Sequence, residues 1–385
     1  MQSRELVAYV TAFTGPLAGN AVLALLGTLQ GEWNVSRTSI LLAIPAFMIP
    51  FAIGQLFSGT ISDAYDRRST IVFGLAVCSL SSFAAALSPS FIVFMGARFI
   101  QGLGYAFVSP VLMVVVSDLA GPGRQGLSMG YYGMATSAGV ATGPLLAGFM
   151  AESNWRLTFL VIGFLGLALI VAQLLLFSRV SKGGHIITAR ALGRQLALTL
   201  GNRNVALLSS AGFLAFFSQI GVMSFVSEHL ESPELDLSSV AIGVVLGVSG
   251  FLGLIISPVS GKLVDLRGAR CCAAVGFVLS GGAAAAMQFA GSYWQFLVLM
   301  SIMGIGTSFV WASLLTMVVR AYPSLKGTTS SVFNSARFAG YALSPVALTP
   351  VYLAFGFELV MLLCASSAGI ALLLSLATGR SLSRR

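Results

Sequence analysis

Two arginines lie deep inside long apolar stretches of the sequence. Arg98 follows about seven residues of an apolar stretch over 91–117, and Arg337 is comparably deep in the stretch over 328–352. At 1.5 Å per residue, Arg98 lies roughly 12 Å along such a helix. A guanidinium is a planar fork of five N–H donors that suits a bidentate acceptor. Because a charge at this depth is costly, we expect both side chains to be functional.

Polar and aromatic residues share a helix face with each arginine. The spacings are i+3, i+7 and i+11 from Arg98, and i−3 and i+4 from Arg337, which places each set on one side of its helix. The residues at these positions are Gln101, Tyr105, Ser109, Asn334 and Tyr341. One hypothesis is that both arginines bind an anionic or strongly hydrogen-bond-accepting part of a substrate. The alternative is that they are structural and donate to backbone carbonyls between helices.

Other chemistry-bearing residue types do not form a recognisable site. All twelve acidic residues fall in loops or at helix ends, so a mid-membrane carboxylate for a cationic substrate is missing. His185 and His229 are in loops, and the four cysteines have no zinc or disulfide spacing. No metal-ligand cluster, nucleophile elbow or phosphate loop is present. We therefore expect no enzyme activity, no cofactor and no metal.

The composition identifies the environment that must hold these residues. Hydrophobic residues make up 57% of the 385 positions and charged residues 9%, with a mean hydropathy of +0.92. A water-soluble domain cannot sustain such values, and a helix crosses a bilayer with about 20 apolar residues. We predict an all-α integral membrane protein of twelve transmembrane helices. The predicted spans are 6–29, 38–61, 70–87, 91–117, 126–150, 157–178, 205–227, 239–261, 270–289, 294–319, 328–352 and 357–378.

Basic residues in the connecting segments are distributed unequally between the two sides. One side receives only Arg37 and Arg156 together with an acidic loop over 228–236. The excess predicts that the other side, with both termini, faces the cytoplasm. The net charge of +9 follows from this topology, and we infer no nucleic-acid partner from it. The basic residues of the cytoplasmic side are Arg4, Arg67, Arg68, Arg124, Arg179, Lys182, Arg190, Arg194, Arg203, Lys262, Arg267, Arg270, Arg320, Lys326, Arg380, Arg384 and Arg385.

The two halves of the chain repeat each other at an offset of about 202 residues. The turn that starts at Gly59 corresponds to the turn that starts at Gly261, and Gly102-Leu-Gly104 corresponds to Gly304-Ile-Gly306. We predict a first six-helix bundle over 1–178, a cytoplasmic linker over 179–204 and a second bundle over 205–385. Within the linker, residues 189–200 form either a short amphipathic helix on the membrane surface or a plain tether.

Three motifs carry a resemblance to a known family. The turn Gly59-x3-Asp63-x2-Asp66-Arg67-Arg68, with its second copy at Gly261, Asp265, Gly268 and Arg270, resembles the loop signature of the major facilitator superfamily. Arg98-x2-Gln101-Gly102 resembles the fourth-helix motif of the twelve-helix drug:proton antiporters, and Gly139-x3-Gly143-Pro144-x3-Gly148 resembles their fifth-helix motif. Asp66 departs from the signature, which usually has glycine there.

The resemblance implies two six-helix bundles related by a pseudo-two-fold axis, with a central cavity between them. Gln219 and Trp311 would then line this cavity with the residues around the two arginines. The small residues at Gly139, Gly143, Pro144 and Gly148 would let helices five and eight approach closely. Charge-assisted pairs at the cytoplasmic helix ends would hold one access state closed. The residues of this predicted gate are Gly59, Asp63, Arg67, Arg68, Asp118, Gly261, Asp265 and Arg270.

The implied function is secondary active transport by alternating access, with export of small metabolites or drugs and the proton as coupling ion. An exchanger or symporter of small organic anions that uses Arg98 and Arg337 is the first alternative. A receptor or scaffold that does not transport would have the same fold, since fold does not fix function. We expect a monomer in the cell (inner) membrane, embedded in the lipid bilayer.

Overall fold

The chain folds almost entirely into helices, which we describe from a computed structural model. The structure describes residues 3–64, 66–119, 125–177, 189–322 and 325–379, with side chains of 58–64, 117, 125–127, 129–130, 189–192 and 326–327 left out of the description. The elements are α1 Ser3–Ala21, η1 Val22–Leu25, α2 Leu26–Trp33, α3 Arg37–Leu41, α4 Ala43–Ala64, α5 Arg67–Ala86, α6 Phe91–Leu119, α7 Gln125–Ala151, α8 Arg156–Leu176, α9 Ala189–Leu200, α10 Arg203–Leu230, α11 Ser239–Arg267, α12 Ala269–Met287, α13 Tyr293–Ala321 and α14 Lys326–Leu376.

Eleven helical segments of the described chain are long and apolar enough to cross a membrane. The last of them contains two predicted spans, because α14 bends at Gly356. Gly356 has a φ of 84°, a left-handed conformation that a residue without a Cβ adopts at low cost. The predicted spans 328–352 and 357–378 lie on either side of this bend. The structure thus has the all-α, multi-span architecture that the composition predicts.

Short polar side chains cap the helices at the turns between spans. The Ser238 side chain accepts from the backbone N–H of Ala241, and the Asn202 side chain accepts from those of Asn204 and Val205. Asp66 caps α5 by accepting from the N–H of Ser69 at 2.9 Å. A cap bond of this kind contributes about 1 kcal/mol. Glycine has no side-chain acceptor, so the departure from the loop signature at Asp66 supplies a helix cap.

The first span is not one continuous α-helix. α1 ends at Ala21, a 3₁₀ turn follows over Val22–Leu25, and α2 continues to Trp33. A 3₁₀ stretch inside a helix changes the hydrogen-bond pattern from i+4 to i+3 and often marks a hinge. This turn, which we call the α1 break, contains neither proline nor glycine. The tertiary contacts that stabilise it are described below.

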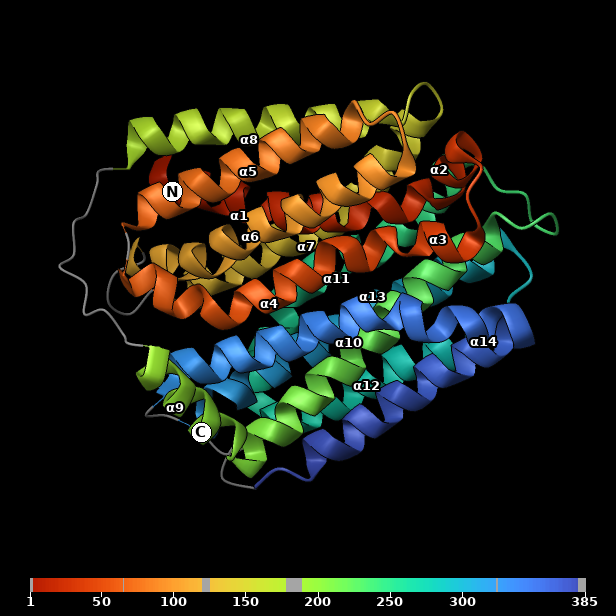
Figure 1. Ribbon diagram of the computed structural model, residues 1–385. Coiled ribbons are helices and arrows are strands. Elements are labelled where there is room, and N and C mark those ends of the chain that lie inside the picture. Colours follow the sequence, from red (N-terminus) through yellow and green to blue (C-terminus); the bar gives the residue numbers. More distant parts are fainter. Residues whose placement is uncertain (1–2, 65, 120–124, 178–188, 323–324, 380–385) are drawn as a thin grey trace.

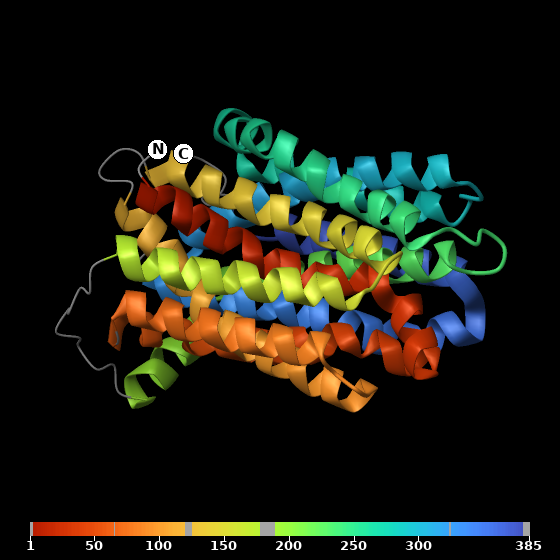
Figure 2. The same ribbon diagram turned by 90° about the horizontal axis from the view of Figure 1, so that it is seen from above.

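The helices run side by side along the long dimension of the molecule (Figure 1). α1, α5 and α8 lie in one part of it, and α10, α12 and α14 in the other, with α4, α7 and α11 near the boundary. Both chain termini lie at one end (Figure 2), where α9 is also found. We call it the α9 end, and the opposite end, with α2 and α3, the α2/α3 end. Of the two alternatives for residues 189–200, the structure has the helix; the boundaries of the two bundles and the linker stay a prediction.

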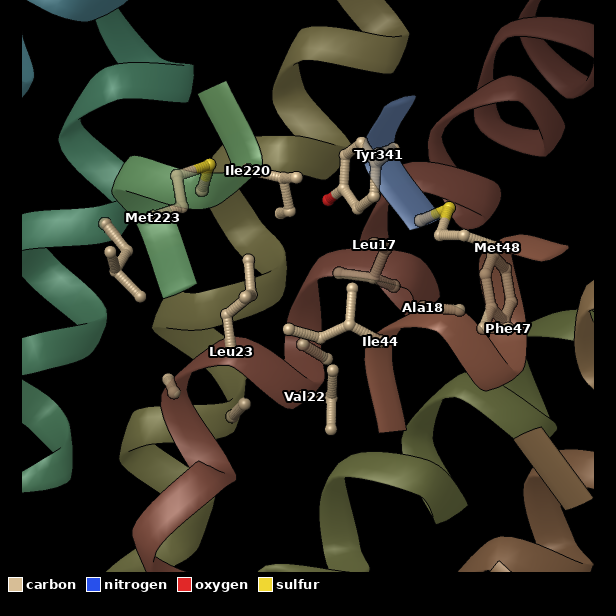
Figure 3. Packing of buried hydrophobic residues seen from close by; sticks show 14 of the residues in the cluster. Leu17, Ala18, Val22, Leu23, Ile44, Phe47, Met48, Ile220, Met223 and Tyr341 are labelled. Carbon is tan, nitrogen blue, oxygen red and sulfur yellow. The ribbon is translucent and has the colours of Figure 1, made fainter. Parts of the chain in front are cut away.

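Large apolar side chains fill the space between the two parts in the middle of the molecule. Figure 3 shows Ile220 and Met223 of α10 facing residues of the first span, with Tyr341 of α14 reaching toward them. Burial of such side chains contributes about 1.5–3 kcal/mol each relative to exposure in water, and dispersion replaces this term where the surroundings are lipid. The contact closes the molecule toward the α2/α3 end. The first-span residues are Leu17, Ala18, Val22 and Leu23, all no more than 1% exposed.

Candidate functional site

A cavity of about 230 Å³ lies between the two parts of the molecule. Its walls come from α1, α4, α6 and α7 on one side and from α10, α11, α12, α13 and α14 on the other. The lining continues from the middle of these helices toward the α9 end, as the positions of Thr11, Gln55 and Met113 show. Six of the eight predicted substrate-binding residues line it. They are Tyr105, Gln219, Trp311, Asn334, Arg337 and Tyr341.

Among the described residues that line this cavity, Arg337 is the one with a positive charge. Its guanidinium carbon lies 4.1 Å from the ring centroids of Trp311 and Phe338 and 4.7 Å from that of Phe216. Aromatic faces attract a cation through their quadrupole, by about 2 kcal/mol where the cation is desolvated. None of the ion pairs among the described residues involves Arg337, and its Nε has no hydrogen-bond partner among them. The rings hold the charge in place without neutralising it.

A buried acceptor lies one helical turn from this donor. The Oδ1 atom of Asn334 has no hydrogen-bond partner in the described part of the chain, and the residue is 8% exposed. Asn334 and Arg337 are three residues apart on α14 and both line the cavity. A buried polar atom without a partner costs about 1–3 kcal/mol. A molecule that accepts from Arg337 and donates to Asn334 would satisfy both.

Arg98 lies outside the cavity lining and is completely buried. Its Nη1 donates to the Ala18 carbonyl at 2.9 Å and to Oε1 of Gln101 at 2.6 Å, and its Nη2 donates to the Gly19 carbonyl at 3.4 Å. The guanidinium carbon also lies 4.6 Å from the Phe47 ring centroid. This is the geometry of the structural alternative, in which the arginine donates to carbonyls of another helix. Direct substrate binding by Arg98 and Gln101 stays a prediction.

The carbonyls that Arg98 holds immediately precede the α1 break. Gln101 continues the network by donating from Nε2 to Oγ of Ser82 at 2.7 Å, so α5, α6 and α1 are joined. On α1 the next residue is Asn20, whose Oδ1 accepts a hydrogen bond from the Tyr341 hydroxyl of α14. Asn20 and Tyr341 both line the cavity, at its limit toward the α2/α3 end. Arg98 is therefore connected to the cavity lining through α1.

Sequence reasoning missed several lining residues. Phe338 packs edge-on against Phe51 with ring centroids 4.4 Å apart, and Tyr132 shares a 3.3 Å hydroxyl contact with Ser109. Asn20 is the clearest omission, since a polar side chain inside an apolar span is itself a signal. Tyr132 and Phe338 carry no comparable signal, because aromatic residues are frequent at lipid-facing and core positions alike.

The predicted gate lies at the α9 end and is described in part. The side chains of Gly59 and Asp63 lie outside the described residues. Arg67 forms an ion pair with Asp118, which joins the ends of α5 and α6. Arg68 donates from Nη2 to the Leu174 carbonyl at 2.7 Å. Both contacts stay within the first six spans, so a gating role for them stays a prediction.

The second copy of the gate repeats one contact of the first copy. Arg270 donates from Nη2 to Oγ1 of Thr378 at 3.3 Å, which joins the start of α12 to the end of α14. Asp265 is exposed, and a Cβ added at Gly261 would meet nothing within 4 Å. The two turns therefore share the contact made by Arg68 and Arg270, whereas the ion pair of Arg67 with Asp118 has no counterpart, because Ala269 and Arg320 stand at the corresponding positions.

The glycines of α7 serve two different interfaces. Gly148 lies against the Ser239 and Val240 backbone at the start of α11, and a Cβ at Gly243 of α11 would lie 2.6 Å from the Pro144 carbonyl oxygen. The fifth and eighth spans, α7 and α11, thus approach closely here. Gly139 and Gly143 instead face α1, where a Cβ at Gly143 would lie 2.7 Å from the Leu17 carbonyl oxygen. Small residues let membrane helices pack backbone to backbone in this way.

Comparison with known proteins finds one family and several relatives, which agree with each other. The sequence model of the Major Facilitator Superfamily matches residues 8–345 and 208–382. The uncharacterized MFS-type transporter YceJ of Bacillus subtilis is 27% identical over 326 residues, which cover 82% of this chain and 80% of the relative. YybF of the same organism is 24% identical over 242 residues, and the chain spans 59% of its length. The quinolone resistance protein NorA of Staphylococcus aureus is 27% identical over 176 residues, 46% of this chain and 45% of that protein.

Proposed function

Because the chain belongs to the Major Facilitator Superfamily, a family of membrane transporters and not of enzymes, we propose that it exports small organic molecules by alternating access. The substrate has an apolar or aromatic body and an anionic or hydrogen-bond-accepting group. Proton antiport drives the export. The protein works as a monomer in the cell (inner) membrane, with the α9 end in the cytoplasm.

One observation carries this proposal, namely the uncompensated charge of Arg337 in an aromatic cavity. Three rings surround its guanidinium, and no carboxylate of the described residues pairs with it. A charge in low-dielectric walls attracts a counter-charge strongly. A substrate with a flat apolar body fits against Trp311, Phe216 and Phe338, while its acceptor group binds Arg337.

The closed and open sides of the cavity support the proposed export. The apolar contact of the first span with Ile220 and Met223 closes the α2/α3 end, and the lining extends toward the α9 end. With the predicted topology, this state receives substrate from the cytoplasm, as an exporter requires. The similarity to NorA, a quinolone resistance protein, supports the export of drug-like molecules.

A second candidate, the exchange or symport of small organic anions, has support from the same arginine. The two functions differ in substrate size and in direction. The cavity favours the exporter, because large aromatic side chains surround Arg337 in it. A small hydrophilic anion would leave these aromatic walls without contacts.

Ligand-dependent thermal stability of the purified protein tests the proposal. A selective ligand at about 100 times its Kd stabilises a protein by about 2.7 kcal/mol. We would compare flat aromatic carboxylates, small anions such as citrate, aromatic cations and neutral drugs. Stabilisation by the first group, followed by its proton-driven accumulation in inverted vesicles, supports the exporter. Stabilisation by small anions alone, or by cations alone, contradicts it.

A further inference from the structure

A second charged cluster lies at the α2/α3 end, on the boundary between the two parts of the molecule. Arg37, the first residue of α3, forms an ion pair with Glu228 in the last turn of α10. The Glu228 side chain is 3% exposed, and its Oε2 has no hydrogen-bond partner among the described residues. The pair therefore joins the first six spans to the last six with one carboxylate oxygen left unsatisfied.

A second carboxylate shares the same arginine. Glu231 follows α10 and is half-buried, and it accepts a hydrogen bond from the backbone N–H of Gly27 on α2. A Cβ at Gly27 would overlap the Glu231 carboxylate, so the two parts of the molecule fit closely here. A polar pocket of about 350 Å³, lined by both glutamates with Gln30 and Asn34, gives water access to the cluster.

The neighbouring residues do not compensate for the excess of two glutamates over one arginine. The guanidinium carbon of Arg37 lies 5.7 Å from the Tyr352 ring centroid. The other titratable groups near it are His229 on α10, Glu234 in the following loop and Glu358 on α14, and the two glutamates act on His229 and on Tyr352. His229 is stacked on Phe357 with ring centroids 4.1 Å apart. With the cluster closed, two buried or half-buried carboxylates face one arginine.

We propose that Glu228 and Glu231 form a proton-binding site: closing the α2/α3 end takes up one proton on this pair, and acid therefore favours the state closed at that end. The inference rests on the alternating access of the proposed function. A carboxylic acid in the pair removes the repulsion between two carboxylates and leaves the other one to Arg37. When the end opens, both side chains become hydrated, and the proton leaves.

The environment of Glu231 gives the sign of the effect. Burial first, and the negative charge of Glu228 second, raise the pKa of Glu231 to about 6. An exposed glutamate has a pKa of about 4.3. A group whose pKa is higher in the closed state favours closure fully below its open-state pKa, and this contribution disappears as the pH rises through about 6. Between about pH 4.5 and pH 7.5 the ratio of open to closed molecules should increase on the order of tenfold.

Distances across the α2/α3 end test the site without any substrate. Spin labels at Gly31→Cys on α2 and Pro233→Cys in the loop after α10, with exposed Cys271 replaced by serine, report opening of this end. We expect the open population to rise with pH in the otherwise unchanged protein. Glu231→Gln imitates the protonated acid, so it should stay mostly closed and lose the pH dependence.

Glu32→Gln is the matched control. Glu32 accepts from Arg156 at 2.8 Å at the same end, but within the first six spans. Its substitution should leave the pH dependence unchanged. Arg37→Gln removes the shared cation and should move the transition to higher pH. A pH-independent open population in the unsubstituted protein overturns the site, and so does the same pH dependence in Glu231→Gln. If the open and closed populations change in Arg37→Gln but do not depend on pH, the proton site is wrong, while alternating access remains supported.

Discussion

The Nη1 atom of Arg98 donates to the backbone carbonyl of Ala18 across a distance of 2.9 Å. With the bond to Gly19, this contact holds the last turn of α1 just before the helix changes to 3₁₀ at Val22. A guanidinium can satisfy two neighbouring carbonyls at once, because its donors form a planar fork. The deep arginine of α6 thus explains how a break without proline or glycine is stabilised inside the bilayer.

Replacement of Arg98 should therefore reduce stability first. Arg98→Gln loses both carbonyl bonds and should cost about 2–4 kcal/mol, and Arg98→Lys should cost nearly as much because an ammonium is a point charge. The thermal midpoint in detergent checks this, with exposed Arg267→Gln as the control. Near-normal stability with weakened substrate binding would instead place Arg98 at the substrate.

The hydrogen bond between Tyr341 and Asn20 should set the balance between the access states. It joins α14 to α1 across the boundary of the two parts and limits the cavity. Tyr341→Phe removes the bond and keeps the ring, so we expect a cost of about 1 kcal/mol to the closed α2/α3 end, roughly a fivefold shift toward opening. Tyr293→Phe on α13 is the control. Distances between labels on the two parts measure the shift, and an unchanged population contradicts this role.

The sequence was informative about the spans and about helix faces, for physical reasons that differ. Hydropathy marks a span because most of its side chains meet lipid or apolar protein, and the bend at Gly356 only divides α14 where the two predicted spans meet. Helical phase placed Tyr105, Asn334 and Tyr341 on faces that line the cavity. The position of a residue on a helix face does not reveal which neighbour that face contacts. Arg98 shares its face with Tyr105, which lines the cavity, and yet Arg98 contacts α1.

The ion pair of Arg37 with Glu228 shows what the sequence could not reveal. Both residues lie at span ends, where charges are ordinary and serve orientation. Their sequence separation of 191 residues gives no local pattern, and only the packing of α3 against α14 and of α2 against α10 brings them together. The α1 break is hidden for the same reason, since the arginine that binds the carbonyls before it lies on α6.

Close packing of α7 against α11 should not tolerate a methyl group at Gly243. A Cβ there lies 2.6 Å from the Pro144 carbonyl oxygen, and a backbone atom cannot yield as a flexible side chain does. Gly243→Ala should cost about 1–3 kcal/mol, in the range of overpacked cores. Gly282→Ala on α12 is a matched control, because its Cβ would meet nothing within 4 Å. Equal thermal midpoints for the two variants would mean that the helices can separate at little cost.

The orientation of the chain is tested by single cysteines on opposite sides. The excess of basic residues predicts that Lys182 lies in the cytoplasm and Ser232 on the other side. In a protein whose native cysteines are replaced, an impermeant thiol reagent should label Ser232→Cys in intact cells and label Lys182→Cys only after permeabilisation. The reverse pattern would invert the direction of transport proposed above.

Arg337 should be required for substrate binding and not for folding. Its guanidinium lies among Trp311, Phe216 and Phe338 without an ion-pair partner in the described chain, so its removal breaks no salt bridge that the fold depends on. A charge-assisted hydrogen bond to a substrate contributes about 1.5–3 kcal/mol, so Arg337→Gln should weaken affinity roughly tenfold to a hundredfold. Arg337→Lys keeps the charge but loses the fork and should also bind more weakly.

Arg320→Lys, near the end of α13, is the control for the general effect of exchanging an arginine for a lysine. Affinity from ligand titrations and the thermal midpoint without ligand should be measured for all three variants. Unchanged affinity in Arg337→Gln, or unfolding of both Arg337 variants, would return this residue to a structural role.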